Sequence, residues 1–418
     1  MTERADVSLW RDANFRWLAA GGAVSALGDQ FTLIALPWLV LALTHDPLAL
    51  GGVLAALSAP RAVFLLAGGA IVDRCRDGAR RILLATRCAS MLLLAALGAL
   101  VLGGHAGMGA VYAFAACIGL CTAFSYPAAS ALLPGVLAPA LLGRANGILM
   151  GMGQVALLVG PVLAGLLIAG GTDAGPAATR GLGLAFLLDA ASFAVAAATL
   201  ARVRSRVRHA APARGGTPLA EFAAGVRHCR GDATLRACFL YWGALALFVG
   251  GPLQVALPLL AARLGGAGAY GSLVAAHGAG MLAGMVLAGL RPDLRLGSFG
   301  TTLLAADGTV GLLLVALAGI ASLWQGMALL VAVGVLGGYL QTAMLTWLQR
   351  RLPADLLGRG MALLMFVLLG VTPLSAALTG WRLRVAGLGP VLAGAGLATL
   401  AIVAAGFAGT RIRTLAKA

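Results

Sequence analysis

The stretch AVSALGDQFTLIALPWLVLAL, residues Ala23–Leu43, is apolar enough to enter a bilayer, yet it contains an aspartate, Asp29, near its middle. About 20 consecutive apolar residues are needed for a helix to cross the hydrocarbon core. An ionisable group at that depth costs about 2.5–3.5 kcal/mol on insertion scales and is usually retained for a function. The stretch therefore predicts a membrane helix that contains a functional acid.

The composition of the whole chain agrees with this interpretation. The chain has 418 residues, of which 61% are hydrophobic and 11% charged, and its mean hydropathy is +0.96. Soluble domains contain about 25% charged residues, so the sequence predicts an integral membrane protein. The net charge of +16 does not indicate nucleic-acid binding, because no polar segment exceeds about 35 residues and DNA-binding proteins concentrate their basic residues on a folded polar domain.

The apolar segments predict an all-α membrane protein with twelve transmembrane helices in two six-helix bundles. We expect an N-terminal bundle over 1–201, a cytoplasmic linker over 202–235 with an amphipathic helix on the inner leaflet, and a C-terminal bundle over 236–418. The expected spans are 15–43, 48–72, 82–102, 108–130, 146–169, 181–201, 236–262, 268–290, 299–321, 324–346, 360–381 and 387–409.

Basic residues predict the orientation of these spans. Of the 30 Lys and Arg residues, 25 fall in loops on the side of the N-terminus and four on the opposite side. Arg87 is counted with the loop before the third span, and Arg61 lies inside the second. Because cytoplasmic loops are enriched in Lys and Arg, we expect both termini in the cytoplasm. The N-terminal segment lacks a short apolar core with a cleavage site, so we do not interpret it as a removable signal peptide.

The two halves of the chain repeat each other. Three motifs recur in the same order with offsets of 221, 220 and 215 residues: Ala35–Leu43 as Ala256–Leu264, Gly69 and Asp73 as Gly289 and Asp293, and Pro139–Arg144 as Pro353–Arg359. Parallel repeats of this kind are found in transporters that rock about a central site.

With this architecture the chain resembles the major facilitator superfamily. The strongest local match is GGAIVDRCRDGARRILL, residues Gly68–Leu84, which is similar to the family's signature in the loop between helices 2 and 3. The fifth span contains LVGPVLAGLL, residues Leu158–Leu167, similar to a motif of proton-exchanging exporters; its matching residues are Gly160, Pro161 and Gly165.

Further phrases, including LGDQFTLIALP and AFLLDAASF, resemble the macrolide-efflux and siderophore-exporter branch of that superfamily. The resemblance implies export of a hydrophobic or amphipathic small molecule across a bacterial inner membrane in exchange for protons. Import or uniport on the same fold, and a non-transporting receptor or assembly partner, remain alternatives. Fold-level resemblance does not identify a substrate.

Asp29 and Arg61 form the expected proton-coupling pair. Asp29 lies about 21 Å and Arg61 about 18 Å from the N-terminal side of the membrane, at 1.5 Å per residue. Opposite charges at one depth can both persist in a low dielectric. The alternative is a static ion pair that fixes the first helix against the second. Asp189 and Asp307 are also intramembrane; both fall on helices that the family places at the periphery, so either a structural or a coupling role is open.

The family resemblance also implies a conformational gate on the cytoplasmic side. Asp73 is expected to meet the positive N-terminal end of the helix near Arg359, and Asp293 the one near Arg144. The alternative is a juxtamembrane cluster that only holds topology. The full set of expected gate residues is Gly69, Asp73, Arg74, Arg80, Arg81, Asp293, Arg144 and Arg359.

Polar and aromatic residues on the helices that line the family's central cavity are candidate substrate contacts, although aromatic residues near helix ends are often interface anchors. These candidates are Gln30, Tyr126, Tyr241, Trp242, Gln254, Gln341 and Trp347.

The sequence offers no site for a metal, a cofactor or enzyme chemistry. The five histidines are dispersed, and no phosphate-binding loop followed by Lys-Ser/Thr is present, which argues against an ATP-driven pump. We therefore expect a monomeric, cofactor-free, non-enzymatic protein whose partners are a small-molecule substrate, protons and membrane lipids, without nucleic acid.

Overall fold

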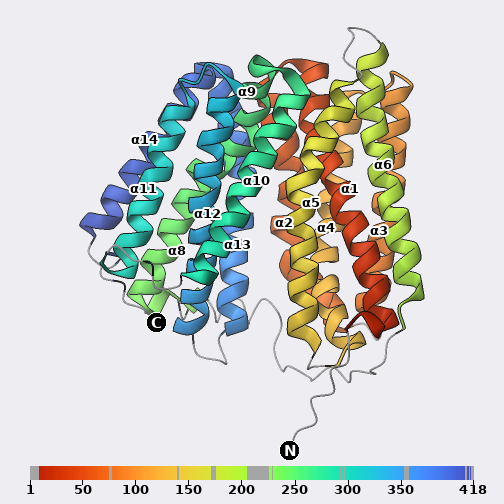
Figure 1. The fold of residues 1–418 in the computed structure, drawn as a ribbon, viewed down its shortest axis with the longest axis horizontal. Helices are drawn as coiled ribbons and strands as arrows, with labels where there is room; N and C mark the ends of the chain where they lie inside the picture. Colours follow the sequence, from red (N-terminus) through yellow and green to blue (C-terminus); the bar gives the residue numbers. More distant parts are fainter. Residues whose placement is uncertain are drawn as a thin grey trace, which may run out of the picture.

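The computed structural model is an all-helical bundle of two side-by-side halves, with α8 to α14 in one half and α1 to α6 in the other (Figure 1). It describes residues 9–74, 78–138, 141–170, 176–204, 226–227, 229–291, 294, 297–352, 357–409, 412–413 and 415. Within these residues twelve segments are long and apolar enough to span a membrane, which confirms the predicted fold class.

The helices of the N-terminal half are α1 (Ala13–Thr44), α2 (Pro47–Arg74), α3 (Gly78–Leu102), α4 (Met108–Val136), α5 (Leu142–Ala169) and α6 (Pro176–Arg202), preceded by the short η1 (Leu9–Arg11). Those of the C-terminal half are α8 (Ala233–Leu245), η3 (Ala246–Gly250), η4 (Pro252–Ala256), α9 (Leu257–Leu264), α10 (Gly266–Leu290), α11 (Phe299–Leu317), α12 (Leu323–Arg351), α13 (Leu357–Ala386) and α14 (Leu388–Ala408). The predicted linker helix lies largely outside the described residues.

Short polar side chains begin several of these helices. Asp12, Asp46 and Ser298 accept hydrogen bonds from first-turn backbone N–H groups of α1, α2 and α11, and Ser322 forms a reciprocal capping box with Gln325 at α12. Such caps satisfy backbone donors that have no partner within the helix. At the other end of α1, His45 has a φ of 51° and its N–H bonds the Leu41 carbonyl, so the chain turns directly into α2.

Asp232 caps α8 and also pairs with Arg351 at the end of α12, with 3.0 Å between Arg351 Nη2 and Asp232 Oδ2. Its partial burial by itself raises the pKa of this carboxyl. Hydrogen bonds from the backbone of Leu235 and Thr234 and the charge of Arg351 outweigh that effect and lower the pKa. The charged form of Asp232 therefore stabilises the start of α8 and its contact with the end of α12.

The seventh span differs from the single helix expected over 236–262. It consists of α8, two wide-turned π-helical segments, η3 and η4, and then α9. Pro252 has no N–H to donate four residues back, which favours such a break. Ser375 of α13 bridges the break, because its hydroxyl donates to the Leu247 carbonyl at 2.5 Å and accepts from Gly251 N at 2.8 Å.

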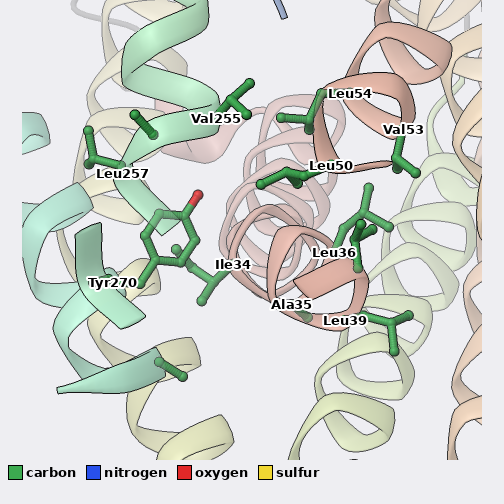
Figure 2. Packing of buried hydrophobic residues seen from close by; sticks show 14 of the residues in the cluster. Ile34, Ala35, Leu36, Leu39, Leu50, Val53, Leu54, Val255, Leu257 and Tyr270 are labelled. Carbon is green, nitrogen blue, oxygen red and sulfur yellow. The ribbon is translucent and has the colours of Figure 1, made fainter. Parts of the chain in front are cut away.

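The buried core explains how the halves are joined. We call the end of the bundle where α1 begins and α14 ends the terminal end, and the other the far end (Figure 1). At the far end one continuous core takes residues from both halves; Figure 2 shows Tyr270 of α10 facing Ile34 of α1. At the terminal end each half has its own core, one around Phe15 and Leu132 and the other around Trp242 and Trp347. The halves are thus joined at the far end and packed separately at the terminal end.

Glycines make the far-end junction close. A Cβ at Gly51 of α2 would lie 2.6 Å from the Ala376 carbonyl oxygen of α13, and one at Gly165 of α5 would lie 2.8 Å from the Ala267 carbonyl oxygen of α10. Small residues allow helices to approach at this distance in membranes. Outside this packing, Arg384 of α13 pairs with Asp46 at 3.6 Å, which adds one exposed ion pair between the halves.

Candidate functional site

The site is centred on Asp29, which lies in the middle of α1. Its side chain is exposed, while the preceding residue, Gly28, is buried. A Cβ at Gly28 would lie 2.6 Å from Asp189 Oδ1 of α6. The backbone of α1 therefore touches the second intramembrane acid, and the turn of the helix presents Asp29 on an open face.

Arg87 of α3 is the main charged neighbour of Asp29, with a stronger electrostatic interaction than Arg61 has. Its Nη1 donates to Ser25 Oγ of α1 at 2.8 Å, and its guanidinium lies 5.8 Å from the centre of the Phe193 ring of α6. By its place in the sequence, Arg87 belongs to the group of arginines that predicts the topology. Its place five residues inside the expected span 82–102 was the signal that it faces the bundle.

Arg61 of α2 is the second cation near Asp29. Its Nε donates to Thr122 Oγ1 of α4 at 3.3 Å, and its positive charge attracts Asp29. Tyr126, also on α4, is 70% exposed. Among the described residues Asp29 has no ion pair within 4.0 Å, so Arg61 and Arg87 act on it at longer range.

Asp189 is held differently from Asp29. It is only 1% exposed, and its two oxygens accept hydrogen bonds from the hydroxyls of Thr32 at 2.5 Å and Ser192 at 3.1 Å. No cation lies within 4.0 Å of it in the described part of the chain. The structure thus contains one accessible and one enclosed carboxylate on neighbouring helices.

This arrangement has a defined chemical capacity. An accessible carboxylate near two guanidinium groups can bind a proton from water and thereby change the local charge by one, whereas an arginine in a protein does not lose its proton. Because Asp29 is not held in a direct ion pair by the described residues, its protonation requires no such bond to break. The site can therefore convert proton binding into a changed force on Arg61 and Arg87.

The candidate cavity residues separate into two groups. Gln254 and Gln341 are exposed like Tyr126, and Gln30 is half-buried with its Oε1 lacking a hydrogen-bond partner. The others belong to the terminal-end core of the C-terminal half: Tyr241 donates to Asp307 Oδ2 at 2.7 Å, and the rings of Trp242 and Trp347 lie 6.1 Å apart. In this conformation those three side chains are buried.

The predicted gate is only partly described. Gly69, Asp73 and Arg74 lie in the last turns of α2 and Arg359 in the first turn of α13, but their side chains, and Asp293 entirely, are outside the described residues. Arg81 and Arg144 are exposed at the starts of α3 and α5. Arg80 donates to the Ala201 carbonyl of α6 at 2.7 Å. The gate remains a prediction.

The motif of the fifth span lies where the halves meet. Gly160 packs on Gln30 of α1, while on α10 Pro161 lies against Gly271 and Gly165 lies against Ala267. The helix α5 therefore contacts both α1 of its own half and α10 of the opposite half.

The comparisons with known proteins agree with this architecture. Residues 18–377 match the family profile described as Major Facilitator Superfamily. The chain belongs to the Major Facilitator Superfamily. No curated protein sequence matches it significantly.

Solved structures of several transporters have the same fold. A bacterial homologue of the human lysosomal transporter Spinster, in an inward-facing and occupied conformation, superposes with a TM-score of 0.75 at 14% identity, covering 97% of both chains. A bacterial homologue of the iron transporter ferroportin, in an inward-facing state, gives 0.74 at 18% identity over 96% of this chain and 99% of that one. The nucleoside transporter NupG gives 0.72 at 10% identity over 96% and 99%.

Proposed function

We propose that this superfamily member is a proton-coupled exporter of a hydrophobic or amphipathic small molecule in the bacterial inner membrane. The observation that supports it is the exposed carboxylate of Asp29, which lies inside a membrane span and within electrostatic range of two arginines. A charge at that depth is expensive and is usually functional. The terminal end is proposed to face the cytoplasm, in agreement with the arginine distribution.

Alternating access follows from the two kinds of packing. The separate terminal-end cores leave the halves free to part on the cytoplasmic side, and the shared far-end core closes the other side. A substrate would enter from the cytoplasm between the halves. Separation of the far-end core and closure of the terminal end would then expose the same site to the outside.

The helix α1 connects the acid to this movement. It contains Asp29 and, one to three turns later, the residues Ile34–Val40 that pack in the shared core. Proton binding to Asp29 removes its attraction for Arg87 and Arg61, which lie on α3 and α2. Because α2 also contacts α13 through Gly51, a change in these forces reaches the junction of the halves. A proton that enters from outside would in this way favour return to the inward-open state.

The experiment is transport of a compound panel into inverted membrane vesicles, with and without an imposed proton gradient. Export in the cell appears as gradient-dependent uptake in these vesicles. Asp29→Asn is expected to abolish the dependence on the gradient while substrate exchange at equal pH persists.

The matched control is Leu33→Asn, which adds the same amide at another exposed position one turn away on α1. This variant should keep the gradient dependence. Normal gradient-driven transport by Asp29→Asn would refute coupling through Asp29. Gradient-driven loss of compound from the vesicles would indicate import, and transport that ignores the gradient in the wild type would indicate uniport.

A further inference from the structure

A third intramembrane carboxylate, Asp307, lies in the C-terminal half and has no part in the mechanism above. It is the ninth residue of α11 and lies on the same side of that helix as the buried Leu303, Leu304 and Val310. Its Oδ2 accepts the hydroxyl of Tyr241 from α8 at 2.7 Å. Among the described residues this is its single hydrogen bond, and no cation lies within 4.0 Å of it.

Among the described residues, no charged group of the neighbouring helices lies within 4.0 Å of Asp307; Arg236 of α8 is exposed and donates to the Arg230 carbonyl at 2.9 Å. Tyr241 and Cys238 are the titratable groups of the adjoining face of α8, and α14, which packs along α11, contains no titratable residue. On α12, Tyr339 donates to the Leu294 carbonyl, and Arg350 and Arg351 lie in the last turn.

Two arginines described at the terminal end of this half have other partners. Arg351 pairs with Asp232, and Arg413, beyond α14, stacks on Phe407. A carboxylate that stays ionised in such surroundings is costly, and proton uptake removes that cost.

In the internal repeat, Asp307 corresponds to a residue that already belongs to the candidate site, Arg87. Asp307 follows Arg87 by 220 positions, the offset that also relates Gly69 to Gly289. Each residue links the third span of its half to the first: Arg87 donates to Ser25 of α1, and Asp307 accepts from Tyr241 of α8. The two links join corresponding spans, although Tyr241 follows Ser25 by 216 positions and not by 220. They also differ in chemistry, because arginine stays protonated whereas a carboxyl group can exchange a proton.

The bond between Asp307 and Tyr241 lies close to the π-helical break in the first span of the C-terminal half. Tyr241 lies five residues before η3, the beginning of the π-helical break that Ser375 bridges. A change in the strength of the bond between Asp307 and Tyr241 therefore acts on the helix segment that leads into the break. Bonds to an ionised acceptor are roughly twice as strong as neutral ones.

We propose that Asp307 is a second proton-binding site of the transporter, separate from Asp29 and located in the C-terminal half. The proton comes from water to Asp307 and returns to water when released, while the Tyr241 hydroxyl keeps its own proton and donates to the carboxyl oxygen in both states. Binding weakens the Tyr241 bond and release strengthens it.

Infrared difference spectroscopy of the full-length protein in lipid nanodiscs, recorded between acidic and alkaline pH, tests this with protons as the probe. The wild type is expected to show absorption of a protonated carboxyl group that Asp307→Asn lacks. Asn keeps an oxygen that accepts from Tyr241, so folding should be retained. Tyr241→Phe should keep that band but shift its frequency, because the carboxyl group loses its hydrogen bond.

The two proton sites are distinguished by their own variants. Asp29→Asn should keep the Asp307 band, and Asp307→Asn should keep any band that belongs to Asp29. Spectra of Asp307→Asn identical to those of the wild type, or a band unmoved by Tyr241→Phe, would overturn the second site and leave the role of Asp29 untouched. Loss of the Asp29 band alone, with transport still following the gradient, would refute the proposed coupling and leave Asp307 standing.

Discussion

The contact between Gly51 of α2 and α13 provides the sharpest test of how the halves separate. A Cβ at this position would lie 2.6 Å from the Ala376 carbonyl oxygen and 2.9 Å from the Gly380 Cα, whereas ordinary contacts begin near 3.4 Å. The obstacle is backbone on both sides, so it cannot be relieved by turning a side chain. Gly51→Ala must push α2 and α13 apart by several tenths of an ångström.

The expected size of the effect follows from that overlap. Overpacking by one methyl group typically costs about 1–3 kcal/mol. The cost applies only while the far end is closed, because the two helices no longer touch once it opens. The equilibrium should therefore shift by about 5- to 150-fold toward the state that is open at the far end.

Spin-label distance measurements can report this shift. Labels on Leu43→Cys and Val385→Cys, both exposed on α1 and α13 near the far end, should show a larger population of long distances in Gly51→Ala, in a background without native cysteines. Gly109→Ala is the matched control, since nothing lies within 4 Å of a Cβ there. An unchanged distance distribution in Gly51→Ala would refute the assignment of this contact as the closed side of the transporter.

Three further variants probe the energetics around the site. Arg384→Ala should favour far-end opening by less than about fivefold and only at low salt, because exposed ion pairs contribute about 0–1 kcal/mol; a larger, salt-independent shift in the same distance assay would contradict this. Thr32→Val should destabilise the protein by about 1–3 kcal/mol in detergent melts, since buried Asp189 loses a donor. The control Thr372→Val, which loses a bond to a carbonyl of its own helix, should have a smaller effect; equal losses would argue against the role of Thr32. Asp232→Ala should cost about 0.5–2 kcal/mol at neutral pH. The folded-state pKa of Asp232 is lowered, so its contribution to the free energy of unfolding is present above its unfolded pKa of about 3.9 and is lost as the pH falls through the folded value. Melting curves of wild type and variant should therefore converge in acid. A difference that persists there would show that the charge is not responsible.

The sequence by itself determined the membrane spans and their number. Hydrophobic stretches of membrane length specify the twelve spans because the bilayer requires about 20 apolar residues and satisfied backbone groups in each. The repeat specified two related halves, and the cost of a charge at membrane depth predicted a functional role for Asp29. These are local properties of the chain, so no knowledge of neighbouring helices was needed.

Tertiary structure decided which side chains meet. In the sequence Arg87 is one of several arginines near a loop. In the structure its guanidinium reaches from α3 to Ser25 of α1, near Asp29. Likewise, Tyr241, Trp242 and Trp347 have the composition of a binding surface but pack into a core in this conformation. The break at Pro252 depends on Ser375, which is more than 100 residues away. The rotation of each helix about its axis and the identity of its neighbours follow from packing between distant segments, and sequence periodicity contains neither.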